Sequence, residues 1–213
     1  MKKIWALVQG DWLNLWRSSK VIFGMILLYE VIYLLAGEEW IFLSVLSVAL
    51  GGMLSYSSLG YDERSGWNRF ILTTAYSRKD YVLGKYLVAL MGTIGGGVVL
   101  ALVGLIADLT GKVPLESGLV LMAGPMACGT LISLSIVLPL AFYFGIEKAR
   151  LLNMLVIFLI FAGAGGMAGV GGSAMEEFPS LITGLNFILP VVTVCLLLLS
   201  SFLSVRIYQK RQF

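Results

Sequence analysis

Long runs of apolar residues, broken by short polar segments, make up almost the whole chain. Six such runs are present, at residues 21–36, 40–59, 81–107, 119–144, 151–170 and 187–205. A helix needs about 20 mostly apolar residues to cross the roughly 30 Å hydrocarbon layer of a membrane, because each residue rises about 1.5 Å. The pattern therefore predicts an all-α integral membrane protein, with six transmembrane helices in a single domain over residues 21–213.

Residues 1–20 precede the first apolar run and carry a helical pattern of their own. Projection at about 100° per residue gathers aromatic and aliphatic residues on one arc: Ile4, Trp5, Leu7, Val8, Trp12, Leu15 and Trp16. The opposite arc holds Lys2, Lys3, Asn14 and Arg17, whereas Asp11 and Leu13 break the pattern. A helix with tryptophans on one face and basic residues on the other is typical of a segment lying flat at the membrane surface.

The composition agrees with a membrane protein and narrows its function. Charged residues make up only 13% of the chain, against about 25% in ordinary soluble domains. Six transmembrane helices and their turns leave no room for a soluble catalytic domain. The formal net charge of +3 is also too small to suggest a surface that binds nucleic acid.

The basic residues fall almost entirely on one side of the predicted membrane. Of all Lys and Arg residues, only Lys112 lies in a loop on the other side. Positively charged loops are retained in the cytoplasm during insertion. We therefore expect both the N-terminus and the C-terminus to be cytoplasmic.

Residue types that carry catalysis are missing from the sequence. The chain has no histidine, which removes the commonest general base and the commonest metal ligand. It also lacks a phosphate-binding GxxxxGK[ST] loop, so it has no means of hydrolysing ATP by itself. We expect a protein that is not an enzyme and that holds no metal or cofactor of its own.

Glu30 is the one ionisable residue well inside a predicted transmembrane helix. An isolated charge in lipid is costly, so such a residue is a candidate for function, here in a translocation path. The alternative is that its side chain extends to the outer surface of the membrane.

Small residues four positions apart occur in several of the apolar runs, as in Gly92 with Gly96 and Gly165 with Gly169. This spacing puts both residues on one face of a helix, where the missing side chains let a second backbone approach closely. We expect these faces to pack tightly within one subunit; the alternative is that residues 163–172 form a flexible or subunit-contacting helix end.

The segment between the second and third runs mixes charges of both signs with aromatic residues. Its first half, residues 62–72, predicts a short amphipathic helix, with Trp67, Phe70 and Ile71 available to insert into a partner. Ser77 followed three positions later by Asp80 is typical of a helix start. On physical grounds alone, the alternative is an interfacial loop held at the membrane by its tryptophan and arginines.

In this segment the chain resembles the permease subunits of type-2 ATP-binding-cassette (ABC) exporters, a small bacterial family with six transmembrane helices. The residues that match the family pattern are Asp62, Glu63, Gly66, Trp67, Phe70, Ser77, Arg78, Lys85 and Tyr86, while Ala75 stands where proline is usual. The resemblance implies a cytoplasmic coupling loop at about residues 60–80 that docks on a separate ATPase. The implied ATPase-coupling residues are Asp62, Glu63, Arg64, Gly66, Trp67, Arg69, Phe70 and Arg78.

The resemblance also implies an assembly and an activity. Two copies of this chain would join two cytoplasmic ATPase subunits, which bind ATP and Mg, in the bacterial cell membrane. Together they would export an amphipathic peptide or a hydrophobic compound.

Two other functions stay open at this point. A self-contained channel or secondary carrier would be expected to show polar residues lining several transmembrane helices, and Glu30 alone falls short of that. A non-transporting immunity or scaffold protein would make the resemblance a coincidence.

Overall fold

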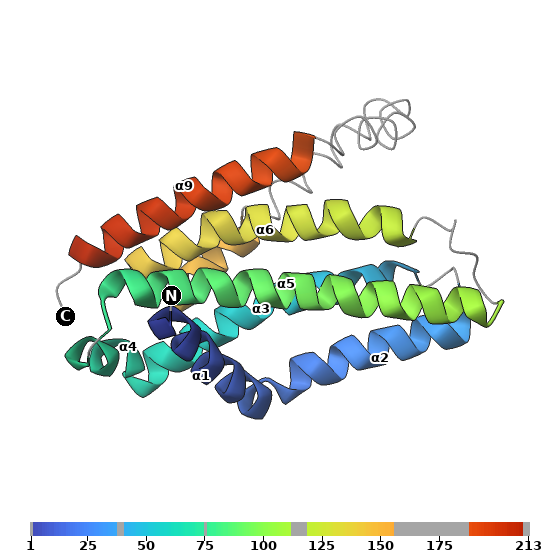
Figure 1. Cartoon of the computed structure of the whole chain (residues 1–213), viewed down its shortest axis with the longest axis horizontal. Helices are drawn as coiled ribbons and strands as arrows, with labels where there is room; N and C mark the ends of the chain where they lie inside the picture. Colours follow the sequence, from blue (N-terminus) through green and yellow to red (C-terminus); the bar gives the residue numbers. More distant parts are fainter. Residues whose placement is uncertain (1, 38–40, 75, 112–118, 156–187, 211–213) are drawn as a thin grey trace.

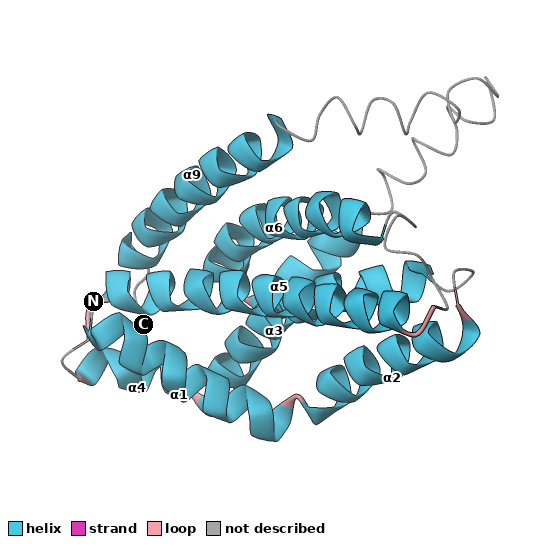
Figure 2. Ribbon diagram, turned by 45° about the vertical axis from the view of Figure 1, so that its right-hand side comes forward, coloured by secondary structure: helices cyan, strands magenta, loops and turns pink. Residues whose placement is uncertain are grey.

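The computed structural model describes residues 2–37, 41–74, 76–111, 119–155 and 188–210, and this part of the chain is helical without strands (Figures 1 and 2). The helices are α1 (Lys2–Ser18), α2 (Lys20–Ala36), α3 (Ile41–Ser65), α4 (Trp67–Phe70), the 3-10 helix η2 (Ile71–Thr73), α5 (Arg78–Leu109), α6 (Leu119–Phe144) and α9 (Ile188–Lys210). Residues 146–155 are also helical. The all-α prediction therefore agrees with the described structure.

Four of the described helices, α3, α5, α6 and α9, are long and apolar enough to cross a membrane. Helix α2 has only 17 residues, which span about 26 Å, and it meets this criterion only together with α1, from which it bends by 73°. The described residues thus hold four or five candidate spans. Most of the predicted span at residues 151–170 lies outside the described residues, so the count of six stays a prediction, as does the cytoplasmic side of the termini.

Helix α5 occupies the middle of the bundle and contacts α1, α2, α3, α6 and α9 (Figure 1). Glycines bring it very close to α3. A Cβ atom on Gly92 would lie 2.2 Å from the carbonyl oxygen of Gly51, and one on Gly96 would lie 2.8 Å from the Cα of Val48. The packing predicted for Gly92 and Gly96 is confirmed, whereas Gly165 and Gly169 lie outside the described residues.

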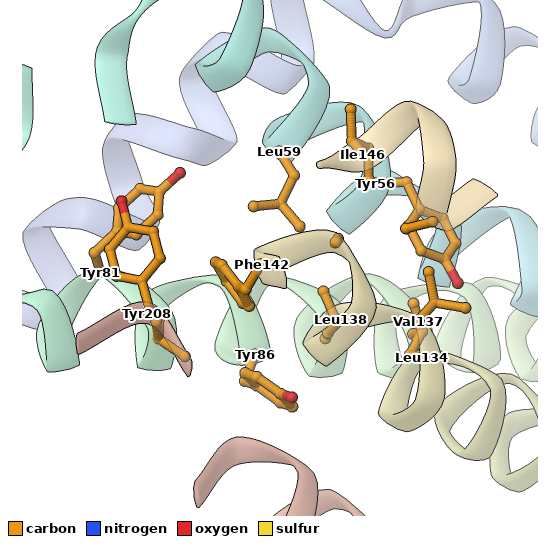
Figure 3. Packing of buried hydrophobic residues seen from close by; sticks show 14 of the residues in the cluster. Tyr56, Leu59, Tyr81, Tyr86, Leu134, Val137, Leu138, Phe142, Ile146 and Tyr208 are labelled. Atoms are coloured by element: carbon orange, nitrogen blue, oxygen red, sulfur yellow. The ribbon is translucent and has the colours of Figure 1, made fainter. Parts of the chain in front are cut away.

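One end of the bundle gathers α1, α4, the start of α5 and the end of α9, and we call it the α4 end (Figure 1). An aromatic cluster fills its interior (Figure 3). The rings of Tyr81 on α5 and Tyr208 on α9 stack with their centroids 5.3 Å apart, and Phe142 on α6 packs edge-on against both. These contacts join α5, α6 and α9 close to the segment for which the sequence predicts ATPase coupling.

The prediction of one continuous helix over residues 62–72 is wrong, because the segment is divided between the end of α3 and the separate helix α4. Helix α3 runs on to Ser65, so Asp62 and Glu63 belong to its last turns. Gly66 then adopts a left-handed conformation with φ of +71°, which ends an α-helix at low cost only when the residue is glycine. The chain restarts at Trp67 as the separate short helix α4.

The predicted start of the third transmembrane helix is confirmed. Helix α5 begins at Arg78, directly after Ser77. The backbone N–H of Asp80 donates to Ser77 Oγ at 3.1 Å, and the backbone N–H of Ser77 donates to Asp80 Oδ2 at 3.0 Å. This reciprocal pair satisfies two backbone donors that the first helical turn leaves free.

Candidate functional site

A buried group of charged and polar side chains joins α1, α3 and α5 at the α4 end. Lys85 Nζ lies 2.8 Å from both carboxylate oxygens of Asp11 and 2.7 Å from Asp62 Oδ2. It also donates to Ser58 Oγ at 2.7 Å, and the hydroxyl of Tyr81 donates to Asp62 Oδ2 at 2.8 Å. We call these five residues the Lys85 cluster.

Two carboxylates share one ammonium in the Lys85 cluster, and the Asp11 side chain is partly buried, with 11% of it exposed. Lys85 is 1% exposed and Asp62 is 3% exposed. Burial raises the pKa of the Asp11 carboxyl above its ordinary value, and the Lys85 ammonium offsets part of that rise. Because each buried charge depends on the others for its stability, the cluster fixes α1 against α3 and α5.

Sequence reasoning singled out members of this cluster without bringing them together. Asp11 broke the amphipathic pattern of residues 1–20, and Asp62 and Lys85 matched the family pattern. A polar residue such as Asp11, at a position where the helical pattern predicts an apolar one, was the available signal for a buried partner. The separation of Asp11 and Lys85 by 74 positions kept the sequence pattern from pairing them.

Three of the predicted ATPase-coupling residues make side-chain hydrogen bonds inside the chain, and a fourth, Arg64, forms an exposed ion pair with Glu147 at 4.0 Å. Asp62 belongs to the Lys85 cluster. Glu63 Oε2 accepts the backbone N–H of Ile146 at 2.9 Å, so it caps the helix at residues 146–155. Arg78 Nη1 donates to the backbone oxygen of Gln209 at 2.6 Å and to that of Tyr208 at 3.3 Å. These side chains hold the α4 end together.

The other predicted coupling residues form the exposed surface of the same segment. Trp67 is 41% exposed and Phe70 is 58% exposed, and their ring centroids lie 5.4 Å apart. Arg64 and Arg69 are exposed on either side, and Gly66 makes the turn between α3 and α4. Trp67 and Phe70 are thus accessible to a partner, as predicted. The prediction that Ile71 is also accessible is wrong, because Ile71 is buried in the core.

A groove of about 430 Å³ lies between α1 and α4. Leu7 and Asp11 line it from α1, Trp67 and Tyr76 line it from the coupling segment, and Asp62 lines it from the end of α3. The exposed aromatic surface and the buried Lys85 cluster therefore adjoin each other.

Glu30 lies far from this end, enclosed between α2 and α3. It is 4% exposed, and Ser44 Oγ donates to its Oε2 atom. Ser47, one turn after Ser44 on α3, is buried beside the same carboxyl. The alternative interpretation, in which the Glu30 side chain extends to the surface, does not agree with this burial. A role of Glu30 in translocation stays a prediction.

Comparison with known proteins identifies the family. A family model described as ABC-2 family transporter protein matches residues 6–209. No curated protein and no solved structure matches the chain. Members of this membrane family pair in general with a cytoplasmic ATPase subunit, and the several apolar helices make the chain a multi-pass membrane protein. The resemblance found in the segment after α3 is thus confirmed, and the chain belongs to the ABC-2 family of transporter proteins.

Proposed function

We propose that this chain is the transmembrane subunit of an exporter that is driven by ATP hydrolysis on a separate ATPase subunit. The observation that carries this proposal is the exposed pair Trp67 and Phe70 on the short helix α4. Aromatic side chains with arginines beside them are common energetic centres of protein interfaces. The N-terminal helix α1 lies next to α4 across the groove and would form the edge of the docking surface.

The contacts around α4 support a route for mechanical coupling. Helix α4 follows α3 after the single residue Gly66, and η2 connects α4 to the segment that leads into α5. The hydroxyl of Tyr208 on α9 donates to the backbone oxygen of Asn68 at 3.3 Å, and the Lys85 cluster ties α1 to α3 and α5. Closure of the ATPase subunits against α4 would therefore shift these helices as a unit and bias the membrane domain toward another conformation.

We propose two copies of this chain, each with one ATPase subunit, and a path between the copies that leads out of the cytoplasm. The cargo we propose is an amphipathic peptide or a hydrophobic compound. The scarcity of charged side chains within the apolar helices supports a cargo of this kind, since a strongly polar substrate would need polar groups along its path.

We expect the double substitution W67A/F70A to abolish ATP-driven transport while the protein still inserts. Removing both rings takes away the apolar centre of the docking surface, so recovery of the ATPase should fall by about tenfold or more. The measurement is purification of the tagged chain from its native membrane in mild detergent, with quantitative mass spectrometry of any chain that carries a GxxxxGK[ST] motif.

The double substitution L102A/I106A provides the matched control, because Leu102 and Ile106 are exposed apolar side chains in the last third of α5, the helix end opposite α4. Equal recovery of the ATPase with wild type and W67A/F70A would contradict docking through α4. Recovery of the wild-type chain alone would favour a channel or a scaffold. Charge reversal at Glu63 is a poorer probe, because it would also remove the cap of the helix at residues 146–155.

A further inference from the structure

A second groove at the α4 end faces away from the Lys85 cluster and lies between α5 and α9. Its volume is about 440 Å³. Leu83, Leu198 and Phe202 contribute exposed apolar side chains to it, and two basic residues, Lys79 and Arg206, also line it.

Within the part of the chain that the structure describes, the basic residues of this groove have no carboxylate partner. Among the described residues, no ion pair involves Lys79 or Arg206, and the guanidinium of Arg206 lies over the ring of Phe202, 4.4 Å from its centroid. The nearest acidic residue in sequence, Asp80, instead accepts hydrogen bonds from Ser77. The groove therefore combines an apolar wall with two uncompensated positive charges.

The two helices that form the groove are held at a fixed separation. Arg78 donates to backbone oxygens at the end of α9, and Tyr81 stacks on Tyr208. Further along, the hydroxyl of Tyr86 lies 2.6 Å from Ser200 Oγ and 2.8 Å from Ser204 Oγ. A groove with such walls exists before its ligand arrives, which lowers the entropic cost of binding.

We propose that this groove binds an anionic phospholipid. The phosphate lies against Lys79 and Arg206, and one acyl chain follows the apolar wall toward Leu198. Lys79 is in the first turn of α5 and Arg206 is near the end of α9, so both lie where these helices leave the hydrocarbon, at the depth of lipid headgroups. A second copy of the chain fits less well, because a twofold contact centred here would bring the same positive charges together.

The test compares lipid affinities of the purified full-length chain by native mass spectrometry, with dioleoylphosphatidylglycerol and dioleoylphosphatidylcholine as the probes. We expect the anionic lipid to bind more tightly to wild type, and K79Q/R206Q to weaken its binding by about tenfold. The control K20Q/K148Q removes the same charge from exposed sites elsewhere and should bind as wild type does.

A further variant separates a lipid from other occupants. Ser201→Phe fills the groove without changing its charge, so it should weaken binding of the anionic lipid. In wild type, inorganic phosphate should compete poorly with that lipid. Unchanged binding in K79Q/R206Q, equal loss in K20Q/K148Q, or full competition by phosphate would overturn the proposal. A shift from dimer to monomer in S201F, measured by light scattering, would also overturn it in favour of a second copy. None of these outcomes depends on whether the chain exports a cargo.

Discussion

Replacing Lys85 by methionine should destabilise the folded chain by about 3–5 kcal/mol, because Asp11 and Asp62 would then be buried without a positive partner. Methionine keeps the length and apolar stem of lysine, so the loss reports the charge rather than a cavity. The expected result is a large drop in the melting temperature of the purified protein. Gel filtration after heating measures it, through the amount of protein that stays folded at each temperature. Disorder of α1 should accompany it, since Asp11 is the only charged residue that α1 contributes to the Lys85 cluster.

Two further variants make this prediction specific. Lys79→Met alters an exposed lysine in the same helix and should leave the melting temperature nearly unchanged. The triple variant D11N/D62N/K85M removes all three charges and should regain much of the stability lost in K85M, because no uncompensated charge remains buried. A K85M protein as stable as wild type would show that the cluster does not hold the α4 end together.

The parts of this fold that the sequence predicts well depend on short-range physics. The start of α5 follows from Ser77 and Asp80, which satisfy each other's backbone donors within a single turn. The close approach at Gly92 and Gly96 follows from their spacing, because residues four apart share a helix face. In both cases the residues that decide the structure are neighbours in the chain.

The internal arrangement of the coupling segment shows why other predictions failed. The helical pattern of residues 62–72 predicts one helix, but Gly66 in its left-handed conformation ends α3 and changes the direction of the chain before α4. Trp67 and Phe70 stay exposed, whereas Ile71 turns into the core. One residue with positive φ therefore changes which side chains face a partner, and the helical pattern of the sequence does not encode that turn.

The candidate site also depends on contacts between residues far apart in the chain. Glu63 and Ile146 are separated by 83 positions, and Arg78 and Gln209 by 131. A charged residue in a loop gives the same local pattern whether it caps a distant helix or binds a partner. Sequence reasoning therefore found the right segment, while the division between internal and exposed residues required the fold.

The contact between α3 and α5 gives the second large effect, because Gly92→Ala should prevent the two helices from packing as they do. The new Cβ would lie 2.2 Å from the carbonyl oxygen of Gly51 and 3.1 Å from its carbonyl carbon. Both atoms belong to a helix backbone, so the strain is relieved only if α3 and α5 move apart. Overpacking of this kind costs about 1–3 kcal/mol, and sometimes more.

Gly95→Ala is the control that isolates this contact, because a Cβ on Gly95 meets nothing within 4 Å. Alanine in a helix interior is favoured over glycine by about 0.5–1 kcal/mol, so G95A should be as stable as wild type or slightly more stable. The melting temperatures of the two variants in the same detergent should therefore move in opposite directions. Similar values for G92A and G95A would contradict the close approach of α3 and α5. A lower melting temperature for G92A alone would mean that backbone contact holds α3, the helix that precedes α4, against α5 at the centre of the bundle. Coupling through α4 requires such a contact.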